Sequence, residues 1–72
     1  MSAAEFELKI HKKEGVCYIP KKLREQYGLR PIILPNDAAA VMYNPEATSD
    51  EVIRSLRVLI EHLQLRSSKE DR

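Results

Sequence analysis

The residues of this sequence best suited to chemistry are cations gathered near its amino terminus. From Lys9 to Arg24 there are six lysines and arginines and one acid, Glu14, which gives a net charge of +5. From Pro31 to Arg72, five basic and seven acidic residues give −2. Fixed cations clustered in this way attract phosphates and other polyanions. The other interpretation is a solvated charged surface that has no ligand.

The sequence holds no recognisable catalytic or metal-binding pattern. No nucleophile lies beside a base and an orienting acid, and a chain with two glycines offers no glycine-rich phosphate loop. The two histidines, His11 and His62, lack the spacing of zinc ligands. The single cysteine, Cys17, cannot form an intramolecular disulfide and is predicted to be buried in a strand. We therefore predict no enzyme activity, no cofactor and no metal.

Two strands joined by a turn are predicted to position the first of the cations. Phe6, Leu8 and Ile10 alternate with polar residues, which is the period of a half-buried strand. Residues 16–19 are β-rich and apolar on both faces, and Gly15 can adopt a positive φ in the turn before them. The sequence predicts a hairpin over these segments.

A short helix is predicted to carry the other cations. Pro20 suits the first turn of a helix, and Gly28 is a natural stop. Between them, Leu23 and Tyr27 lie four residues apart and form an apolar stripe. A helix of about two turns is shorter than the ~12–15 residues that are marginally stable alone. This helix must therefore pack onto the strands.

The rest of the chain predicts a second hairpin and a long helix. The hairpin strands are residues 32–34 and 38–43, with Pro35-Asn36-Asp37 in the turn. A capping box, Thr48-Ser49-Asp50-Glu51, then begins a helix whose apolar residues recur at 4-3-4 spacing. The polar end, residues 67–72, is predicted to be a disordered tail.

The chain is short enough to need stabilisation from outside its own core. Below about 70–80 residues one core rarely supplies more than ~3–5 kcal/mol, so small domains add a disulfide, a metal or a partner chain. With disulfide and metal excluded, oligomerisation is the expected source of buried area. The amino terminus has no signal-peptide pattern, and no run of ~18 apolar residues could span a membrane. We expect a soluble, cytoplasmic protein.

The segment LKIHKKEGVCYIPKKLREQYGL, residues 8–29, resembles the swapped-hairpin domain of the AbrB/SpoVT/MazE family of transcription regulators and antitoxins. The shared pattern is a basic strand and turn, a strand ending in Ile-Pro, a basic helix and a Gly-Leu exit. The Pro-Gly-Asp that usually follows the exit is replaced by Arg30-Pro31-Ile32-Ile33. The resemblance implies a mainly β fold with helices, in which two chains interleave residues 6–45 into a barrel. Residues 46–66 would add an amphipathic helix to this AbrB-like homodimer.

The resemblance also implies which side chains contact double-stranded DNA, because the family uses basic residues of the first hairpin and the short helix. The matching positions are Lys9, His11, Lys12, Lys13, Lys21, Lys22, Arg24 and Arg30. A lysine is a point charge suited to phosphate, whereas Arg24 can also make two hydrogen bonds to a guanine edge. We therefore assign the lysines to positioning and Arg24 to specificity. The predicted dimer or partner interface comprises Val16, Tyr18, Ile19, Leu23, Val52, Leu56, Leu59 and Leu63.

Two functions from different classes fit these features. The first is a homodimeric, DNA-binding transcription regulator whose long helix reinforces the assembly or joins dimers. The alternative is an antitoxin of a toxin–antitoxin pair, whose C-terminal helix binds the toxin. Antitoxin tails are usually extended, acidic and disordered until bound, whereas residues 48–66 carry three acids and three arginines. The helix therefore favours the regulator, and a neighbouring toxin gene would favour the antitoxin.

Overall fold

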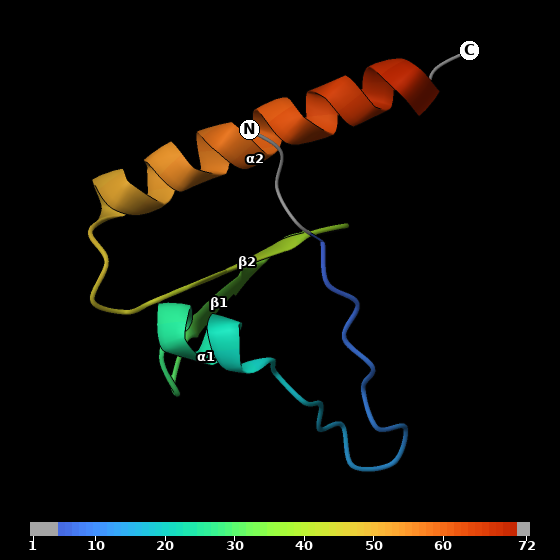
Figure 1. Cartoon of the computed structure of the whole chain (residues 1–72), viewed down its shortest axis with the longest axis vertical. Coiled ribbons are helices and arrows are strands. Elements are labelled where there is room, and N and C mark those ends of the chain that lie inside the picture. Colours follow the sequence, from blue (N-terminus) through green and yellow to red (C-terminus); the bar gives the residue numbers. More distant parts are fainter. Residues whose placement is uncertain (1–4, 71–72) are drawn as a thin grey trace. The chain divides into compact units, whose positions relative to one another are not determined.

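A computed structural model describes residues 5–70 of the chain, which form a small mixed α/β fold (Figure 1). Its elements in chain order are α1 (Lys21–Tyr27), β1 (Ile32–Pro35), β2 (Ala40–Tyr43) and α2 (Ser49–Glu70). The prediction of a mainly β fold is wrong in its balance of strand and helix, because helices contain more of the described residues than strands do. The two strands have 4 residues each, and the helices have 7 and 22.

The chain divides into two compact units. The first, called the basic unit here, spans Phe6–Glu46 and contains α1 and the β1–β2 sheet. The second, the α2 unit, contains Glu5 and α2. All eight predicted DNA-contacting residues belong to the basic unit.

The predicted first hairpin is present as a turn without a ladder. Ile10 and Cys17 form one isolated antiparallel bridge around a turn at residues 12–14, and Gly15 has the expected positive φ of 71°. The two predicted strands on either side of the turn are not formed. Strands are stabilised by cross-strand side-chain pairs and a covered face, but Phe6 is 52% exposed and Ile10 67%. Most side chains of these arms are exposed, so the arms lack the covered face that a strand needs.

Helix α1 begins and ends where the sequence predicts. The carbonyl of Pro20 accepts hydrogen bonds from the amides of Leu23 and Arg24 at 3.0 and 3.1 Å. Gly28 follows the last helical residue with a φ of 85°, and its amide donates to the Arg24 carbonyl at 2.8 Å. A residue with a Cβ rarely adopts this φ, so glycine fixes the end of the helix.

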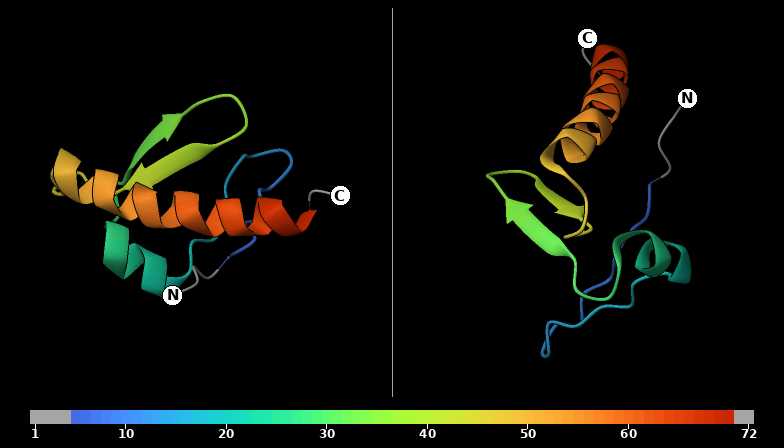
Figure 2. Two further views of the ribbon diagram at one scale, coloured as in Figure 1. Left: turned by 90° about the horizontal axis from the view of Figure 1, so that it is seen from above. Right: turned by 90° about the vertical axis from the view of Figure 1, so that its left-hand side faces the viewer.

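Strands β1 and β2 form the second hairpin, a two-stranded antiparallel sheet that pairs Ile32 with Tyr43 and Pro35 with Ala40 (Figure 2). The amide of Asn36 donates to the Ala39 carbonyl at 2.7 Å, which closes the turn. The predicted turn at residues 35–37 therefore lies one residue further along, and β2 begins two residues later than expected. Alanine has a low strand propensity, which fits this late start.

Helix α2 starts with the predicted capping box. The amide of Glu51 donates to Thr48 Oγ1 at 3.1 Å, and the Thr48 amide donates to Glu51 Oε1 at 2.8 Å. The helix continues to Glu70, so the predicted disorder is wrong for residues 67–70, while 71–72 lie outside the described residues. An i,i+4 ion pair between Arg66 Nε and Glu70 Oε2, 3.0 Å apart, supports the last turn.

No side chain among residues 5–70 is buried. Large hydrophobic residues in both units are exposed, from Leu8 at 41% to Leu29 at 83% in the basic unit alone. Neither α1 nor α2 combines the length and apolarity needed to cross a bilayer. The large apolar side chains of the described residues are therefore exposed to solvent. A folded protein of this size usually buries such side chains, and small domains often do so against a partner chain.

Candidate nucleic-acid interface

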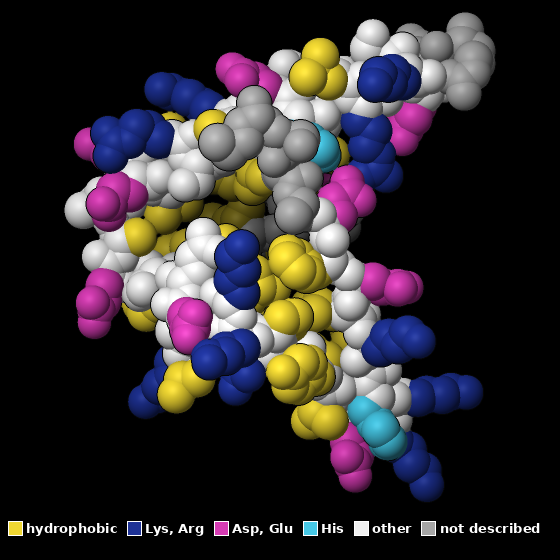
Figure 3. Space-filling view, viewed as in Figure 1, with side chains coloured by type: hydrophobic (Ala, Val, Ile, Leu, Met, Phe, Trp, Pro, Cys, Tyr) yellow, Lys and Arg dark blue, Asp and Glu magenta, His cyan; other side chains and the backbone are white. Residues whose placement is uncertain are grey.

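The first group of cations surrounds the turn of the basic unit. Lys9, His11, Lys12 and Lys13 are all exposed. Figure 3 shows Lys and Arg side chains projecting into solvent in this region, with few acidic side chains between them. The three lysines have no ion-pair partner within residues 5–70. Their charges are therefore available to an anionic ligand.

His11 organises this turn through hydrogen bonds. Its amide donates to the Val16 carbonyl at 2.6 Å, and its carbonyl accepts from the Gly15 amide at 2.7 Å. Its ring nitrogen Nδ1 accepts a hydrogen bond from the Glu14 amide at 3.2 Å. Through these hydrogen bonds His11 shapes the turn that carries Lys12 and Lys13.

The second group of cations lies on α1. Lys21, Lys22 and Arg24 are exposed on this helix. Lys21 Nζ lies 4.0 Å from Glu25 Oε2, with 79% and 67% of the two side chains exposed. An exposed pair at that distance contributes little and is readily exchanged for another anion. Arg30, the remaining candidate, is exposed in the segment between α1 and β1.

Arg24 has an aromatic partner that the sequence analysis missed. Its Cζ lies over the Tyr18 ring, 5.5 Å from the centroid, and its Nη2 lies 3.5 Å from the Tyr18 hydroxyl. Tyr18, predicted at an interface, is 73% exposed in the single chain. The two residues are six positions apart and lie on either side of Pro20, which starts the helix after the arm. Only their types hinted at the pair, since arginine commonly associates with aromatic rings.

Next to this pair, the basic unit has an open groove of about 420 Å³. The groove lies between the 17–19 arm, α1 and the sheet, and its apolar lining includes Cys17, Ile19, Leu23, Tyr27, Ile33 and Met42. Cys17, predicted to be buried, is exposed. The predicted interface residues Ile19 and Leu23 are half-buried here, whereas Val16 is 58% exposed. The groove is open because the arm, α1 and the sheet do not pack fully against one another.

The remaining predicted interface residues lie along α2. Val52 and Leu56 are half-buried, whereas Leu59 is 43% and Leu63 54% exposed. Val58 and Leu65, which lie off this stripe, are 51% and 69% exposed. The apolar surface of α2 is therefore wider than one stripe and largely open.

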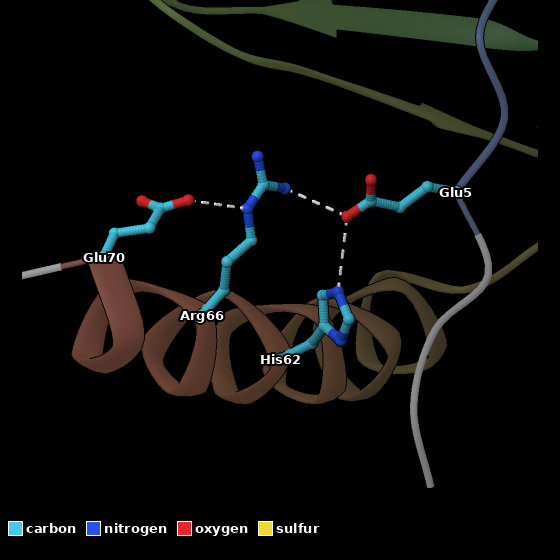
Figure 4. A network of polar contacts seen from close by, with 4 residues as sticks. All are labelled: Glu5, His62, Arg66 and Glu70. Atoms are coloured by element: carbon cyan, nitrogen blue, oxygen red, sulfur yellow. Dashed lines mark hydrogen bonds and ion pairs between the residues drawn. The ribbon is translucent and has the colours of Figure 1, made fainter.

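A polar network in the α2 unit joins the helix to Glu5 (Figure 4). Arg66 Nη1 lies 2.9 Å from Glu5 Oε2. The side-chain hydrogen bond to Glu70, and then the charge of Glu5, raise the pKa of Arg66 above its ordinary value. The His62 Nε2 atom is 3.5 Å from the same Glu5 oxygen; this one atom is shielded from solvent and makes no hydrogen bond within the described part of the chain. The His62 side chain as a whole is half-buried.

No cluster of three or more His, Cys, Asp or Glu side chains that could hold a metal ion occurs within residues 5–70. The exposed cations of the basic unit offer charge attraction and hydrogen bonding to an anionic ligand. Comparison of the chain with protein-family models, curated proteins and solved structures gives no match.

Proposed function

We propose that this protein is a DNA-binding transcription regulator of the AbrB/SpoVT/MazE type, acting as a homodimer. The observation that supports this most directly is the exposure of every predicted DNA-contacting side chain of the basic unit. Among them only Lys21 has an ion-pair partner within the described residues. Exposed cations without partners bind phosphates at little cost, and each phosphate neutralised releases condensed counterions.

The homodimer is proposed because the basic unit lacks a core of its own. Full burial of a Val, Leu, Ile or Phe side chain contributes roughly 1.5–3 kcal/mol. In the basic unit Phe6, Ile10, Val16 and Leu34 are each more than half exposed, so most of this contribution is lost. A second copy that interleaved its arms with these would cover them and pair their free edges. It would also place two basic turns and two α1 helices in one assembly.

The described part of α2 favours the regulator over the antitoxin. This helix is 22 residues long, is closed by a reciprocal capping box and has a neutral balance of charges over residues 48–66. Such a helix is stabilised by interactions within its own sequence, whereas an antitoxin tail is usually disordered until it binds the toxin. In the proposed regulator its apolar stripe reinforces the dimer or links dimers. The antitoxin stays the second candidate. Discovery of a toxin that binds this chain would make the antitoxin the favoured function.

The deciding experiment is a salt titration of binding to duplex DNA. A preferred duplex is first selected from a random pool, and its affinity is then compared with that of a scrambled duplex. If about six to eight phosphates are engaged per dimer, log K against log[salt] falls with a slope near −5 to −7. Tighter binding of the selected duplex at every salt concentration would identify base readout. A monomer at micromolar concentration, or no binding at low salt, would refute the proposal.

A further inference from the structure

The contact between Tyr18 and Arg24 sets this arginine apart from the other cations of the basic unit. The lysines extend into solvent, whereas the Arg24 guanidinium lies over an aromatic ring, with Cζ 5.5 Å from its centroid. That distance falls within the range of a cation–π attraction. Tyr18 itself is 73% exposed, so this large aromatic side chain does not contribute to a hydrophobic core of the single chain.

The contact with Tyr18 restricts the orientation of the Arg24 side chain but leaves most of its N–H donors without a partner. A guanidinium has five N–H donors in its own plane. Within the described residues only Nη2 has a side-chain partner, the Tyr18 hydroxyl, at 3.5 Å, which is the outer limit for a hydrogen bond. The other donors are free to meet a planar pair of acceptors. An arginine held in this way loses less rotamer freedom when it binds.

We infer that Tyr18 is a positioning residue that holds Arg24 for base recognition. This inference rests on the proposed DNA-binding function and adds a residue that the charge pattern did not reveal. The ligand is the major-groove edge of guanine, whose O6 and N7 accept two parallel hydrogen bonds from a guanidinium. The ring of Tyr18 supplies the attraction, and its hydroxyl is secondary because its contact is long.

The exposed ring could instead be covered by a second copy of the chain, and the test must separate these roles. Three variants are compared on the selected and scrambled duplexes: Tyr18→Leu removes the ring, Tyr18→Phe keeps the ring without the hydroxyl, and Arg24→Lys keeps the charge without the planar fork. The readout is the ratio of the two affinities, which a general loss of phosphate binding leaves unchanged.

We expect Tyr18→Leu to lower this ratio about twofold to fivefold, the size of an exposed cation–π contact. Tyr18→Phe should keep most of it. Arg24→Lys should lower it about tenfold or more, because a bidentate base contact is lost. The double variant Tyr18→Leu/Arg24→Lys should be no worse than Arg24→Lys alone. As a matched control, Lys22→Ala should leave this ratio unchanged, so Tyr18→Leu combined with Lys22→Ala should give the same ratio as Tyr18→Leu alone.

Each alternative outcome overturns a different statement. If the wild-type protein does not bind DNA, the proposed function and this inference both fail. If it binds but Tyr18→Leu discriminates like wild type, or its effect multiplies with that of Arg24→Lys, only the inference fails. Dissociation of the oligomer by Tyr18→Leu in sedimentation would assign the ring to an interface instead. If Tyr18→Leu does not fold, the wild-type protein is examined by NMR instead. Arg24 side-chain resonances that match those of the exposed Arg54 would then refute the contact between Arg24 and the Tyr18 ring.

Discussion

The two units of this chain obtain their structure in different ways. Helix α2 runs for 22 residues and is fixed by contacts between residues three or four apart, at Thr48–Glu51 and at Arg66–Glu70. The basic unit consists of a 7-residue helix, two 4-residue strands and arms joined by one bridge. None of these pieces is long enough to be stable alone. The difference indicates that α2 is an autonomous element, whereas the basic unit depends on whatever covers its apolar side chains.

The comparison also separates two kinds of charge. In the basic unit most cations lack partners within the described residues, whereas Arg66 of α2 is held between Glu5 and Glu70. Charges that satisfy one another contribute modestly to stability and attract no ligand. Exposed charges without partners are solvated by water and remain available to an anionic ligand. The predictions below test whether binding and assembly divide between the two units in this way, starting with the largest effect.

The largest effect should come from removing the α1 cations. The triple variant Lys21→Ala, Lys22→Ala and Arg24→Ala should lose roughly a thousandfold in DNA affinity while keeping its oligomeric state, because the proposed dimer would lose six fixed charges. Fluorescence anisotropy and sedimentation measure the two quantities. As a control, changing Arg54, Arg57 and Arg66 to Ala removes the same charge from the other unit and should weaken binding far less. Equal losses in both variants would mean that only net charge matters.

The next effect should come from placing charge in the apolar stripe of α2. Leu56→Asp with Leu59→Asp should dissociate the oligomer or make the protein insoluble, since a carboxylate buried in an interface without a partner is costly. The control is Gln64→Asp with Ser68→Asp, which adds the same charge to polar positions of the same helix. Wild-type sedimentation and melting of the stripe variant would show that this stripe is not an interface.

A smaller effect is expected from removing the cap of α2. Thr48→Ala leaves the Glu51 amide without its side-chain acceptor and should destabilise the helix by about 1 kcal/mol. Circular dichroism should show reduced helicity, and Thr48→Ser should restore it. DNA affinity per folded dimer should not change if the basic unit alone binds. A loss of affinity as large as that of the α1 variant would contradict the division between the units.

The smallest effect should be a pH dependence of the same cap. The Thr48 amide, and after it the Thr48 side chain, form hydrogen bonds with the Glu51 carboxylate that hold its pKa below the ordinary value of 4.5. A lowered pKa in the folded state stabilises the helix above about pH 4.5 and loses this contribution as the pH falls below it through the lowered pKa. Helicity should therefore decline in acid. Glu51→Gln keeps the hydrogen bond without the titration, and an unchanged acid decline in that variant would exclude Glu51 as the cause.

Much of the local structure was predictable because its causes lie close together in the sequence. The capping box needs only Thr48 and Glu51, and α1 is bounded by Pro20 and by Gly28 at φ 85°. The exposure of the candidate cations also follows from residue type, because lysine and arginine are costly to bury. Residues 67–70, whose polar composition predicts disorder, are part of the helix, and Arg66 forms an ion pair with Glu70 there.

The features that could not be predicted depend on residues brought together across turns. Alternation at Phe6, Leu8 and Ile10 predicts a strand, but a strand also needs a neighbour, and only the bridge from Ile10 to Cys17 forms. The pairing of Tyr18 with Arg24 needs the bend at Pro20, and the contact of His62 with Glu5 joins residues far apart in the chain. No periodicity or spacing encodes contacts of this kind.

By itself, the sequence determined where both helices begin, where turns lie to within about a residue and where unpaired positive charge accumulates. These properties arise from interactions within about four residues, namely caps, glycine conformations and side-chain charge. Only the tertiary structure decided that the apolar residues of residues 5–70 stay uncovered and that Arg24 lies over a tyrosine ring. Burial and cation–π contacts depend on where distant side chains meet in space, and a linear pattern of residue types does not contain that information.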